Sequence, residues 1–234
     1  MPHLTVEDWG LIPYKEAWDR QELYFSELLN QKLSNRRAGI VEPLNSYLFF
    51  CEHPHVITMG KTGSLDHLVN GESVLAQKNI DFFKINRGGD VTYHGPGQVV
   101  GYLVFDISSL YEDLHRFIRD IEGCVIRTLA TYGLKGERYS GYTGVWLDSA
   151  LPQARKMCAI GIRTSQWISM HGFALNVNTD LDYFQNIVPC GIKDKAVTSL
   201  AKELKRNLPL QEVKNTLRQE FEKFYAENLI KSPL

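Results

Sequence analysis

The chain has 234 residues, of which 44% are apolar and 23% are charged, and its formal net charge is −1. These proportions are typical of a globular protein that can bury a real core, and the length suits one large domain or two small ones. Because no clear linker is found, we expect a single domain over residues 1–234. No run of about 18 apolar residues and no long basic run occurs, which argues against a membrane span and against nucleic acid as the main partner. The first eight residues lack the basic and apolar regions of a signal peptide, and we therefore expect a cytoplasmic protein.

The first part of the chain predicts short strands and one long helix. Apolar residues recur at helical spacing after Pro13, a residue that fits the first turn of a helix because it has no N–H to leave unpaired. Short runs of β-branched and aromatic residues indicate strands. The expected elements are strands at residues 4–9, 46–51, 82–85 and 99–105, a helix at about 13–33 and a helical turn at 73–77.

Between the predicted strands at 82–85 and 99–105 lies a glycine-rich segment, Arg87-Gly88-Gly89-Asp90-Val91-Thr92-Tyr93-His94-Gly95-Pro96-Gly97-Gln98. Four glycines and a proline in twelve residues argue against regular secondary structure, and glycine lets the backbone approach a ligand closely. The segment is either a ligand-binding loop or a glycine-rich hairpin with scattered polar residues. It is not a dinucleotide-binding fingerprint, because a strand follows it where that motif requires a helix.

The second part of the chain predicts two amphipathic helices that enclose a group of strands. The first helix carries an apolar stripe and ends before Gly133, which suits the position after a helix C-terminus. The expected elements are helices at about 111–132, 199–204 and from Pro209 onward, strands at 141–147, 156–164 and 167–178, and a helical turn at 182–184. Strands and helices do not alternate regularly, which favours a mixed α+β domain over a doubly wound sheet.

The strand at 167–178 has two different faces. Because strand side chains alternate, Phe173, Leu175 and Val177 share one face, and Gly172, Ala174 and Asn176 share the other. A face of small residues of this kind is expected beside a narrow ligand slot.

Cysteines and histidines are the candidate ligands and nucleophiles. The cysteines are widely spread, without a Cys-x-x-Cys pair, so neither disulfides in a reducing compartment nor a zinc site is expected. They are Cys51, Cys124, Cys158 and Cys190. His53 and His55 flank a proline at a strand edge, where histidines are more often turn residues than metal ligands, and we expect no metal there.

Cys190 is the candidate nucleophile, because it lies in a loop between Pro189 and Gly191. Lys156, which enters an apolar strand, is a candidate for activating it. At about 4 Å and an effective dielectric of about 20, a unit charge contributes roughly 4 kcal/mol. Since about 1.4 kcal/mol shifts a pKa by one unit, a drop of about one to two units remains after desolvation. An inert buried thiol and a solvated lysine at a strand end are the alternatives for the two residues.

The glycine-rich segment resembles the signature of the lipoyl(octanoyl) transferases, which move an octanoyl group from acyl carrier protein to a lysine of lipoyl domains. Segments 156–161, 171–178 and 189–191 match the same family in the same order, and residues 52–60 match it more weakly. The resemblance covers about residues 46–199. The fold it implies is α+β, a mixed β-sheet with packed helices, as in the catalytic domain of biotin and lipoate protein ligases.

The resemblance also implies roles for individual residues. Cys190 matches the nucleophile that forms the acyl thioester, and Lys156 matches the lysine that lowers its pKa. The substrate-binding loop is matched by Arg87, Gly88, Gly89, Asp90, Val91, Thr92, Tyr93 and His94. The two small-residue strands that line the acyl slot are matched by Ala159, Ile160, Gly161, Gly172, Phe173 and Ala174.

Two nearby residues need separate mention. His171 is a further candidate, whose role can be limited to a hydrogen bond that holds the loop. Cys158 departs from the family pattern, in which a small residue such as alanine is common there. Because it is two residues from Lys156 on a strand, we expect its thiol on the same face, as a second reactive sulfur near the site.

The implied mechanism is acyl transfer in two steps without ATP or a metal. The Cys190 thiolate takes the octanoyl group from acyl carrier protein, and a lysine amine of a lipoyl domain then attacks the thioester to give an amide. The implied acceptors are the lipoyl domains of 2-oxoacid dehydrogenase complexes and the glycine cleavage H protein. Lys156 or His94 is expected to take the proton from the amine. Arg87, Arg155, Arg163 and Lys193 are candidates for a basic patch that receives the acidic carrier.

Three other functions remain open. An ATP-dependent lipoate or octanoate protein ligase of the same fold would pass through an acyl-adenylate and would need no thiol. A non-catalytic binder would keep the acyl slot and form no covalent adduct. A cysteine peptidase is disfavoured because the sequence has no recognisable cysteine–histidine signature.

Overall fold

The computed structural model describes residues 3–69, 71–188 and 196–229, and a mixed sheet runs through this part of the chain. Strands β1 and β2 pair in parallel, as do β9 and β11, and the other neighbours pair antiparallel. In sheet order the strands are β1 (Leu4–Leu11), β2 (Ser46–Glu52), β6 (Gln98–Val104), β10 (Ile168–Asn176), β9 (Arg155–Ser165), β8 (Tyr142–Leu147) and β7 (Glu137–Tyr139), with β11 (Ala196–Val197) beside β9.

A second, smaller sheet has the order β4 (Asp81–Lys84), β3 (Val56–Met59) and β5 (Val91–His94). The expectation that residues 87–98 form a loop without regular structure is therefore wrong for residues 91–94. Their β-branched and aromatic side chains form a strand, which pairs with β3, and the glycines lie in the turns on either side of it. The glycine-rich segment is not a hairpin either, because the flanking strands β4 and β6 belong to different sheets.

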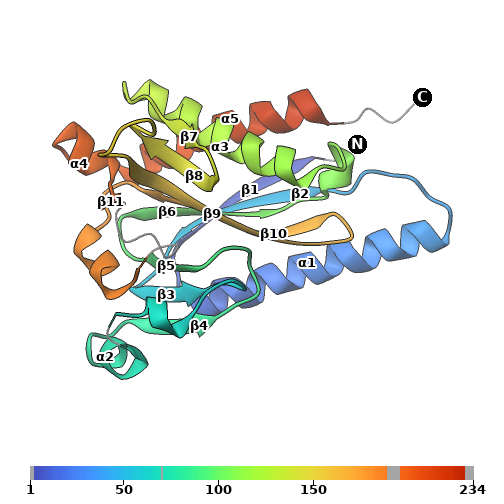
Figure 1. Cartoon of the computed structure of the whole chain (residues 1–234). Coiled ribbons are helices and arrows are strands. Elements are labelled where there is room, and N and C mark those ends of the chain that lie inside the picture. Colours follow the sequence, from blue (N-terminus) through green and yellow to red (C-terminus); the bar gives the residue numbers. More distant parts are fainter. Residues whose placement is uncertain (1–2, 70, 189–195, 230–234) are drawn as a thin grey trace.

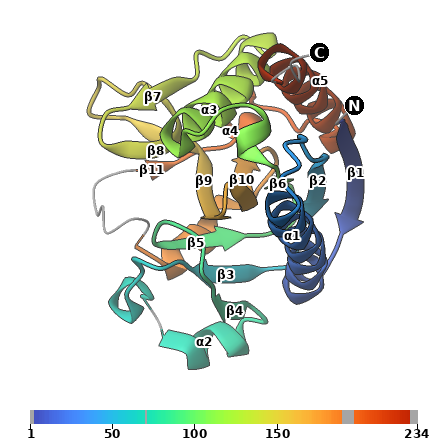
Figure 2. The ribbon, with the colours of Figure 1, turned by 90° about the vertical axis from the view of Figure 1, so that its right-hand side faces the viewer.

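Helices cover both faces of the main sheet. In Figure 1, α3 and α5 lie above the sheet, and α1 lies below it, beside the small sheet; Figure 2 shows the same layers end on. The helices are α1 (Tyr14–Arg37), α2 (Gly71–Gln77), α3 (Leu114–Thr131), α4 (Leu200–Leu204) and α5 (Leu210–Asn228). The start of α3 falls later than predicted, because the Asp113 side chain accepts the N–H of Arg116 and caps the helix there. Among the described residues, no helix is both long and apolar enough to cross a membrane.

The two faces of β10 pack into different cores, as the alternation of its side chains predicted. Phe173 and Leu175 belong to the core beneath α3 and α5, where the Phe173 ring stacks on Phe221 at 5.4 Å. Ala174 belongs to the core on the α1 side of the sheet. The small-residue face of β10 therefore points towards α1 and the small sheet.

A bulge in β9 separates Lys156 from Cys158. Trp146 of β8 pairs with Lys156 and the adjacent Val145 pairs with Cys158, so Met157 has no partner of its own on β8. The expectation that Cys158 shares a face with Lys156 is wrong, because this extra residue breaks the alternation of side chains. Cys158 is fully buried in the α3–α5 core, and burial raises the pKa of its thiol well above the ordinary value. It is an inert core thiol.

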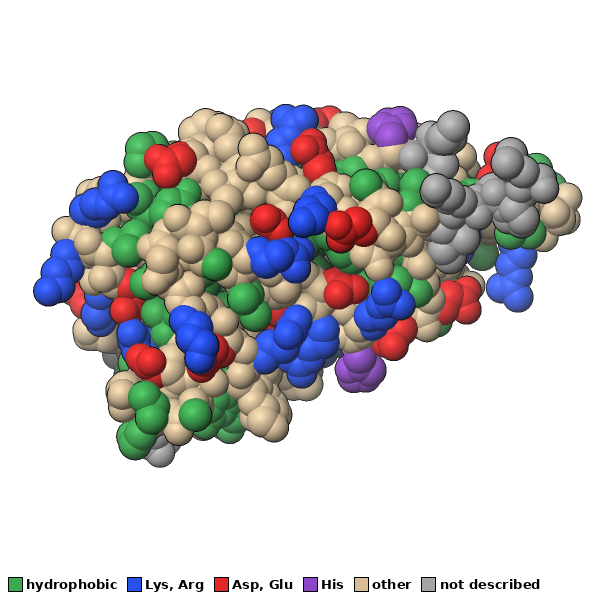
Figure 3. Space-filling view, turned by 90° about the horizontal axis from the view of Figure 1, so that it is seen from above, with side chains coloured by type: hydrophobic (Ala, Val, Ile, Leu, Met, Phe, Trp, Pro, Cys, Tyr) green, Lys and Arg blue, Asp and Glu red, His purple; other side chains and the backbone are tan. Residues whose placement is uncertain are grey.

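The outer face of α3 and α5 carries charges of both signs. Figure 3 looks down on this side of the molecule and shows Lys and Arg side chains interspersed with Asp and Glu. Arg127 and Glu220 form an ion pair between the two helices, and Arg218 pairs with Glu222 along α5. A face of paired charges does not form the single-sign basic stripe that binds nucleic acid.

Candidate active site

A pocket of about 440 Å³ lies where the small sheet meets β9 and β10. Most of the residues predicted to form the site line this pocket. They are Lys156, Arg87, Gly89, Asp90, Val91, Thr92, His94, Ala159, Ile160, Gly161, His171, Gly172, Phe173 and Ala174. The predicted nucleophile, Cys190, lies outside the described residues.

Gly88 and Tyr93 do not line the pocket. The Gly88 N–H donates to the carbonyl of Ile162 and ties the glycine-rich segment to β9. The Tyr93 ring points to the other side of β5, where its hydroxyl lies 2.8 Å from His55 Nδ1 and its ring stacks on Tyr183. Both residues therefore belong to the packing around the pocket and not to its lining.

Arg87 is a buried part of the pocket wall. One of its guanidinium nitrogens donates to the carbonyl and the hydroxyl of Thr58, at 2.8 and 2.9 Å, and the other donates to the Gly88 carbonyl at 3.0 Å. Arginine suits this position because its planar group holds several acceptors in fixed directions. It therefore joins β3 to the start of the glycine-rich segment.

Gly161 and Gly172 line the pocket, but protein atoms occupy the space next to them. A Cβ on Gly161 would lie 2.9 Å from the Gly88 carbonyl oxygen and 3.0 Å from Cδ of Arg87, and a Cβ on Gly172 would lie 2.0 Å from the Gly101 carbonyl oxygen. The interpretation that their small size makes room for an acyl chain is wrong at these positions. Glycine is required because backbone segments pack directly against β9 and β10.

His94 is held in one orientation by a chain of amides. Its Nδ1 lies 2.8 Å from Gln98 Oε1, and the Gln98 amide donates to Asn176 Oδ1, whose own amide donates to the Thr198 carbonyl. This order places a hydrogen on Nδ1 of His94 and leaves Nε2, 3.5 Å from Thr58 Oγ1, unprotonated. Burial and the neighbouring His53 lower the pKa of His94 to about 3, so it stays neutral.

His171 faces the pocket from a strained backbone position on β10. Its φ is +65°, which turns its backbone N–H away from β6 so that it donates to Gln21 of α1. Burial, together with Arg87 and Arg163, lowers the pKa of His171 to about 3. Among the described residues, none forms a hydrogen bond with its buried Nε2.

His53, by contrast, is a core residue. Its Nδ1 lies 2.8 Å from the Ile12 carbonyl and its Nε2 lies 2.7 Å from the Tyr102 hydroxyl, so both ring nitrogens are engaged. Burial lowers the pKa of His53 to about 4. In the described part of the chain, no group of three or more His, Cys, Asp or Glu side chains could hold a metal ion.

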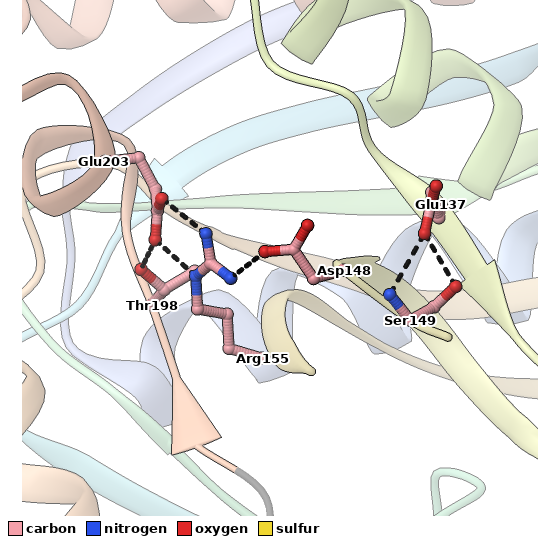
Figure 4. Close-up of polar contacts among 6 residues, drawn as sticks. All are labelled: Glu137, Asp148, Ser149, Arg155, Thr198 and Glu203. Atoms are coloured by element: carbon pink, nitrogen blue, oxygen red, sulfur yellow. Dashed lines mark hydrogen bonds and ion pairs between the residues drawn. The ribbon is translucent and has the colours of Figure 1, made fainter. Parts of the chain in front are cut away.

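Lys156 enters the pocket from the start of β9. Its Nζ lies 4.8 Å from the centre of the Trp146 ring, and its carbonyl accepts the N–H of Thr198. The adjacent Arg155 is held by Glu203 of α4 through two hydrogen bonds of 2.6 and 2.7 Å and also contacts Asp148, while Thr198 donates to the same glutamate (Figure 4). This cluster fixes β11 and α4 against the lysine strand.

The described members of the suggested basic patch do not form one. Arg87 is buried in the pocket wall, Arg155 is held by Glu203 and Asp148, and Arg163 pairs with Glu22 at 2.8 Å. Lys193 lies outside the described residues. The three arginines therefore serve the fold and the pocket, and they are not exposed cations for an acidic partner.

Sequence reasoning missed several residues of the pocket. Tyr14 begins α1, and Thr62 and His67 lie between β3 and α2, where the sequence predicted no site residue. The missed residues are Tyr14, Thr62, His67, Gln98, Val100, Tyr102, Gly141, Tyr142, Thr143, Asn176, Phe184 and Val197. Only Gln98 and Asn176 carried a sequence signal, because both lie in segments that match the family.

Comparisons with known proteins agree with this geometry. The family model of the lipoyl protein ligase A/B catalytic domain matches residues 13–222. An octanoyltransferase of Christiangramia forsetii is 52% identical over 97% of this chain and 97% of its own length. One of Flavobacterium johnsoniae is 51% identical over 86% of this chain and 87% of its own length. The chain belongs to the octanoyltransferase family.

Octanoyltransferases are acyltransferases, and the resemblance inferred from the sequence motifs is thereby confirmed. The fold is confirmed as well. A bi-partite lipoate protein ligase of Thermoplasma acidophilum superposes with a TM-score of 0.71, over 97% of this chain and 85% of that one. At 16% identity this likeness shows the mixed α+β fold alone.

Proposed function

We propose that the protein transfers an octanoyl group from acyl carrier protein to a lysine of lipoyl domains, as the first step of endogenous protein lipoylation. The observation that carries the proposal is 52% identity to an octanoyltransferase over nearly the whole of both chains. The acyl group is held in between as a thioester on Cys190. Neither ATP nor a metal takes part, and phosphopantetheine arrives on the carrier protein.

The pocket supports the binding of an acyl chain. Its volume lies within the range of about 300–1,000 Å³ that small-molecule sites occupy. Val100 and Ala174 give it apolar walls that are buried beneath the surface. At about 0.8 kcal/mol for each buried CH₂, an eight-carbon chain gains several kcal/mol of binding free energy there.

Lys156 supports thioester chemistry at this pocket. A lysine cation favours the thiolate over the thiol, and the thiolate is the form of cysteine that attacks a thioester. Arg155, Glu203 and Thr198 hold the strand that carries Lys156 against β11. The carbon–sulfur bond to the carrier breaks as the bond to Cys190 forms, and the carrier leaves as a thiolate that takes up a proton from solvent.

In the second step the lysine amine of the lipoyl domain attacks the acyl-enzyme. The carbon–nitrogen bond forms, the Cys190 sulfur leaves, and the nitrogen gives up a proton. The acceptors are the lipoyl domains of 2-oxoacid dehydrogenase complexes and the glycine cleavage H protein, and the compartment is the cytoplasm.

The test compares two acyl donors. Purified protein and a lipoyl domain are incubated with octanoyl carrier protein without ATP, or with octanoate and ATP, and the mass of the lipoyl domain is followed. We expect the octanoylated domain from the first mixture alone. A product that forms only with octanoate and ATP would show that the protein is a ligase. If neither donor gives a product, the protein would be a non-catalytic binder.

A further inference from the structure

His171 lines the pocket, although the alternation of side chains along β10 predicts the opposite face for it. Alternation would place it on the face of Phe173, and its partner across the sheet, Ile162 of β9, lies in the core beneath α3 and α5. His171 instead lines the pocket on the other side of the sheet, where Arg87 forms part of the wall. The left-handed backbone at φ +65° explains the difference, because it breaks the alternation at this one residue.

The imidazole that this backbone turns into the pocket lacks a hydrogen bond there. A left-handed backbone is uncommon outside glycine, and residues strained in this way concentrate at functional sites. His171 is 2% exposed, and among the described residues none forms a hydrogen bond with its Nε2. Buried polar atoms are nearly always paired with protein, water or a ligand. The contents of the pocket must therefore supply the partner of Nε2.

The walls of the pocket become more polar towards His171. Ala174 of β10 and Val100 of β6 pair with each other and are apolar. Two residues further along β6, Tyr102 lines the pocket as well, and His171 follows on β10. Lys156 lies at the other end of the series, because β9 and β10 are antiparallel and its strand begins beyond Ala174. The apolar part of the slot therefore lies between Lys156 and the polar end at His171.

This inference rests on the proposed function, under which the reacting end of the acyl chain lies beside Lys156 and the methyl end points towards His171. We propose that His171 limits the length of the acyl chain that the pocket accepts, because a chain longer than eight carbons buries its imidazole without a hydrogen bond. An octanoyl chain lies against the apolar walls and leaves space for water at Nε2. A longer chain displaces that water and offers only CH₂ groups in its place.

The test is a competition among acyl donors. Equal amounts of octanoyl, decanoyl and dodecanoyl carrier protein are mixed with a lipoyl domain and a small amount of the protein. The acylated domains differ in mass, and the ratio of the early products gives the ratio of kcat/KM for the donors. Because all donors compete for the same protein molecules, a loss of folded protein in a variant cancels from this ratio.

The variants are His171→Leu and His171→Asn. Leucine and asparagine have side chains of nearly the same size and shape, so the pair differs mainly in polarity. We expect the unaltered protein to prefer the octanoyl over the dodecanoyl donor, and His171→Leu to reduce this preference by about 10-fold or more, as for removal of a buried polar group that the longer chain leaves unpaired. His171→Asn keeps a buried polar group and should keep most of the preference.

Three results would overturn the proposal. An unaltered protein without a preference for octanoyl would do so, and so would an unchanged ratio in His171→Leu. An equal loss of preference in both variants would show that the bulk of the ring sets the length and that its hydrogen bond does not. The failure of the proposed function looks different, because the unaltered protein would then acylate the lipoyl domain from none of the three donors, and the inference about His171 would fall with it.

Discussion

Replacing Gly161 by alanine tests whether this glycine exists to make room for a ligand or to let two backbones meet. The new Cβ would lie 2.9 Å from the Gly88 carbonyl oxygen and 3.0 Å from Cδ of Arg87. Both are closer than the ordinary van der Waals contact, and the carbonyl belongs to the backbone, so it cannot rotate away. The Gly88 N–H to Ile162 carbonyl bond is next to the collision and is strained first.

The cost follows from overpacking. An extra methyl group forced into a packed site destabilises a protein by about 1–3 kcal/mol. In a domain of about 150–250 residues, each kcal/mol lowers Tm by about 2–4 °C. We therefore expect Gly161→Ala to unfold several degrees earlier in a thermal melt without any ligand, and to unfold at lower urea concentration with an unchanged slope.

Gly123→Ala is the matched control. Gly123 lies inside α3, and its new Cβ would meet the guanidinium ends of two arginine side chains, Arg127 at 3.2 Å and Arg138 at 3.6 Å. Alanine is the better helix former by about 1 kcal/mol, so this variant should be as stable as the unaltered protein or more so. If Gly161→Ala keeps full stability but loses octanoyl transfer, the packing explanation is wrong and the glycine serves the acyl chain.

Three further predictions use other parts of the structure. Burial lowers the pKa of His94 and His53 in the folded protein, so the unfolded chain binds protons at these imidazoles at a higher pH than the folded protein does. The unfolding free energy should therefore fall from pH 7 to pH 5 by roughly 2 kcal/mol for each imidazole. In urea titrations, His94→Gln should make this fall smaller. Arg155→Met should lower the unfolding free energy by about 1–2 kcal/mol, whereas Lys135→Met, at an exposed ion pair, should leave it unchanged. Cys158 should resist alkylation in the folded protein, and Cys158→Ala should keep octanoyl transfer; rapid labelling of Cys158 would contradict its burial.

The sequence was a good guide wherever local pattern decides the structure. The alternation at Phe173 and Ala174 separated the two cores, because the period of a strand is a property of its own residues. Pro13 likewise predicted the start of α1, because its lack of an N–H is a property of the residue itself. The family motifs predicted that segments far apart in the sequence form one site, which no local pattern could indicate. Most residues of these segments line one pocket.

The errors arose where a distant segment determines the structure. Met157 forms a bulge because of the way β9 pairs with β8, and the sequence Lys156-Met157-Cys158 does not predict this pairing. Gly161 is small because the Arg87 segment packs on it from another part of the chain. The strand at 91–94 was hidden because a count over twelve residues combined a strand with the glycine turns at its ends.

His67 shows the limit most clearly. No site motif includes it, and it lines the pocket because the fold brings it within 2.7 Å of Asp90, which is remote along the chain. Pairing of β3 with β5 creates that proximity, and a single sequence contains no record of it.

The acyl-enzyme is the most direct test of the account. The protein is mixed with octanoyl carrier protein in the absence of ATP, and its intact mass is measured, followed by peptide mapping. We predict a gain of about 126 Da, the mass of one octanoyl group in place of a thiol hydrogen, located on Cys190 and lost when a lipoyl domain is added. An adduct on another residue, or no adduct while the lipoyl domain still becomes octanoylated, would contradict it.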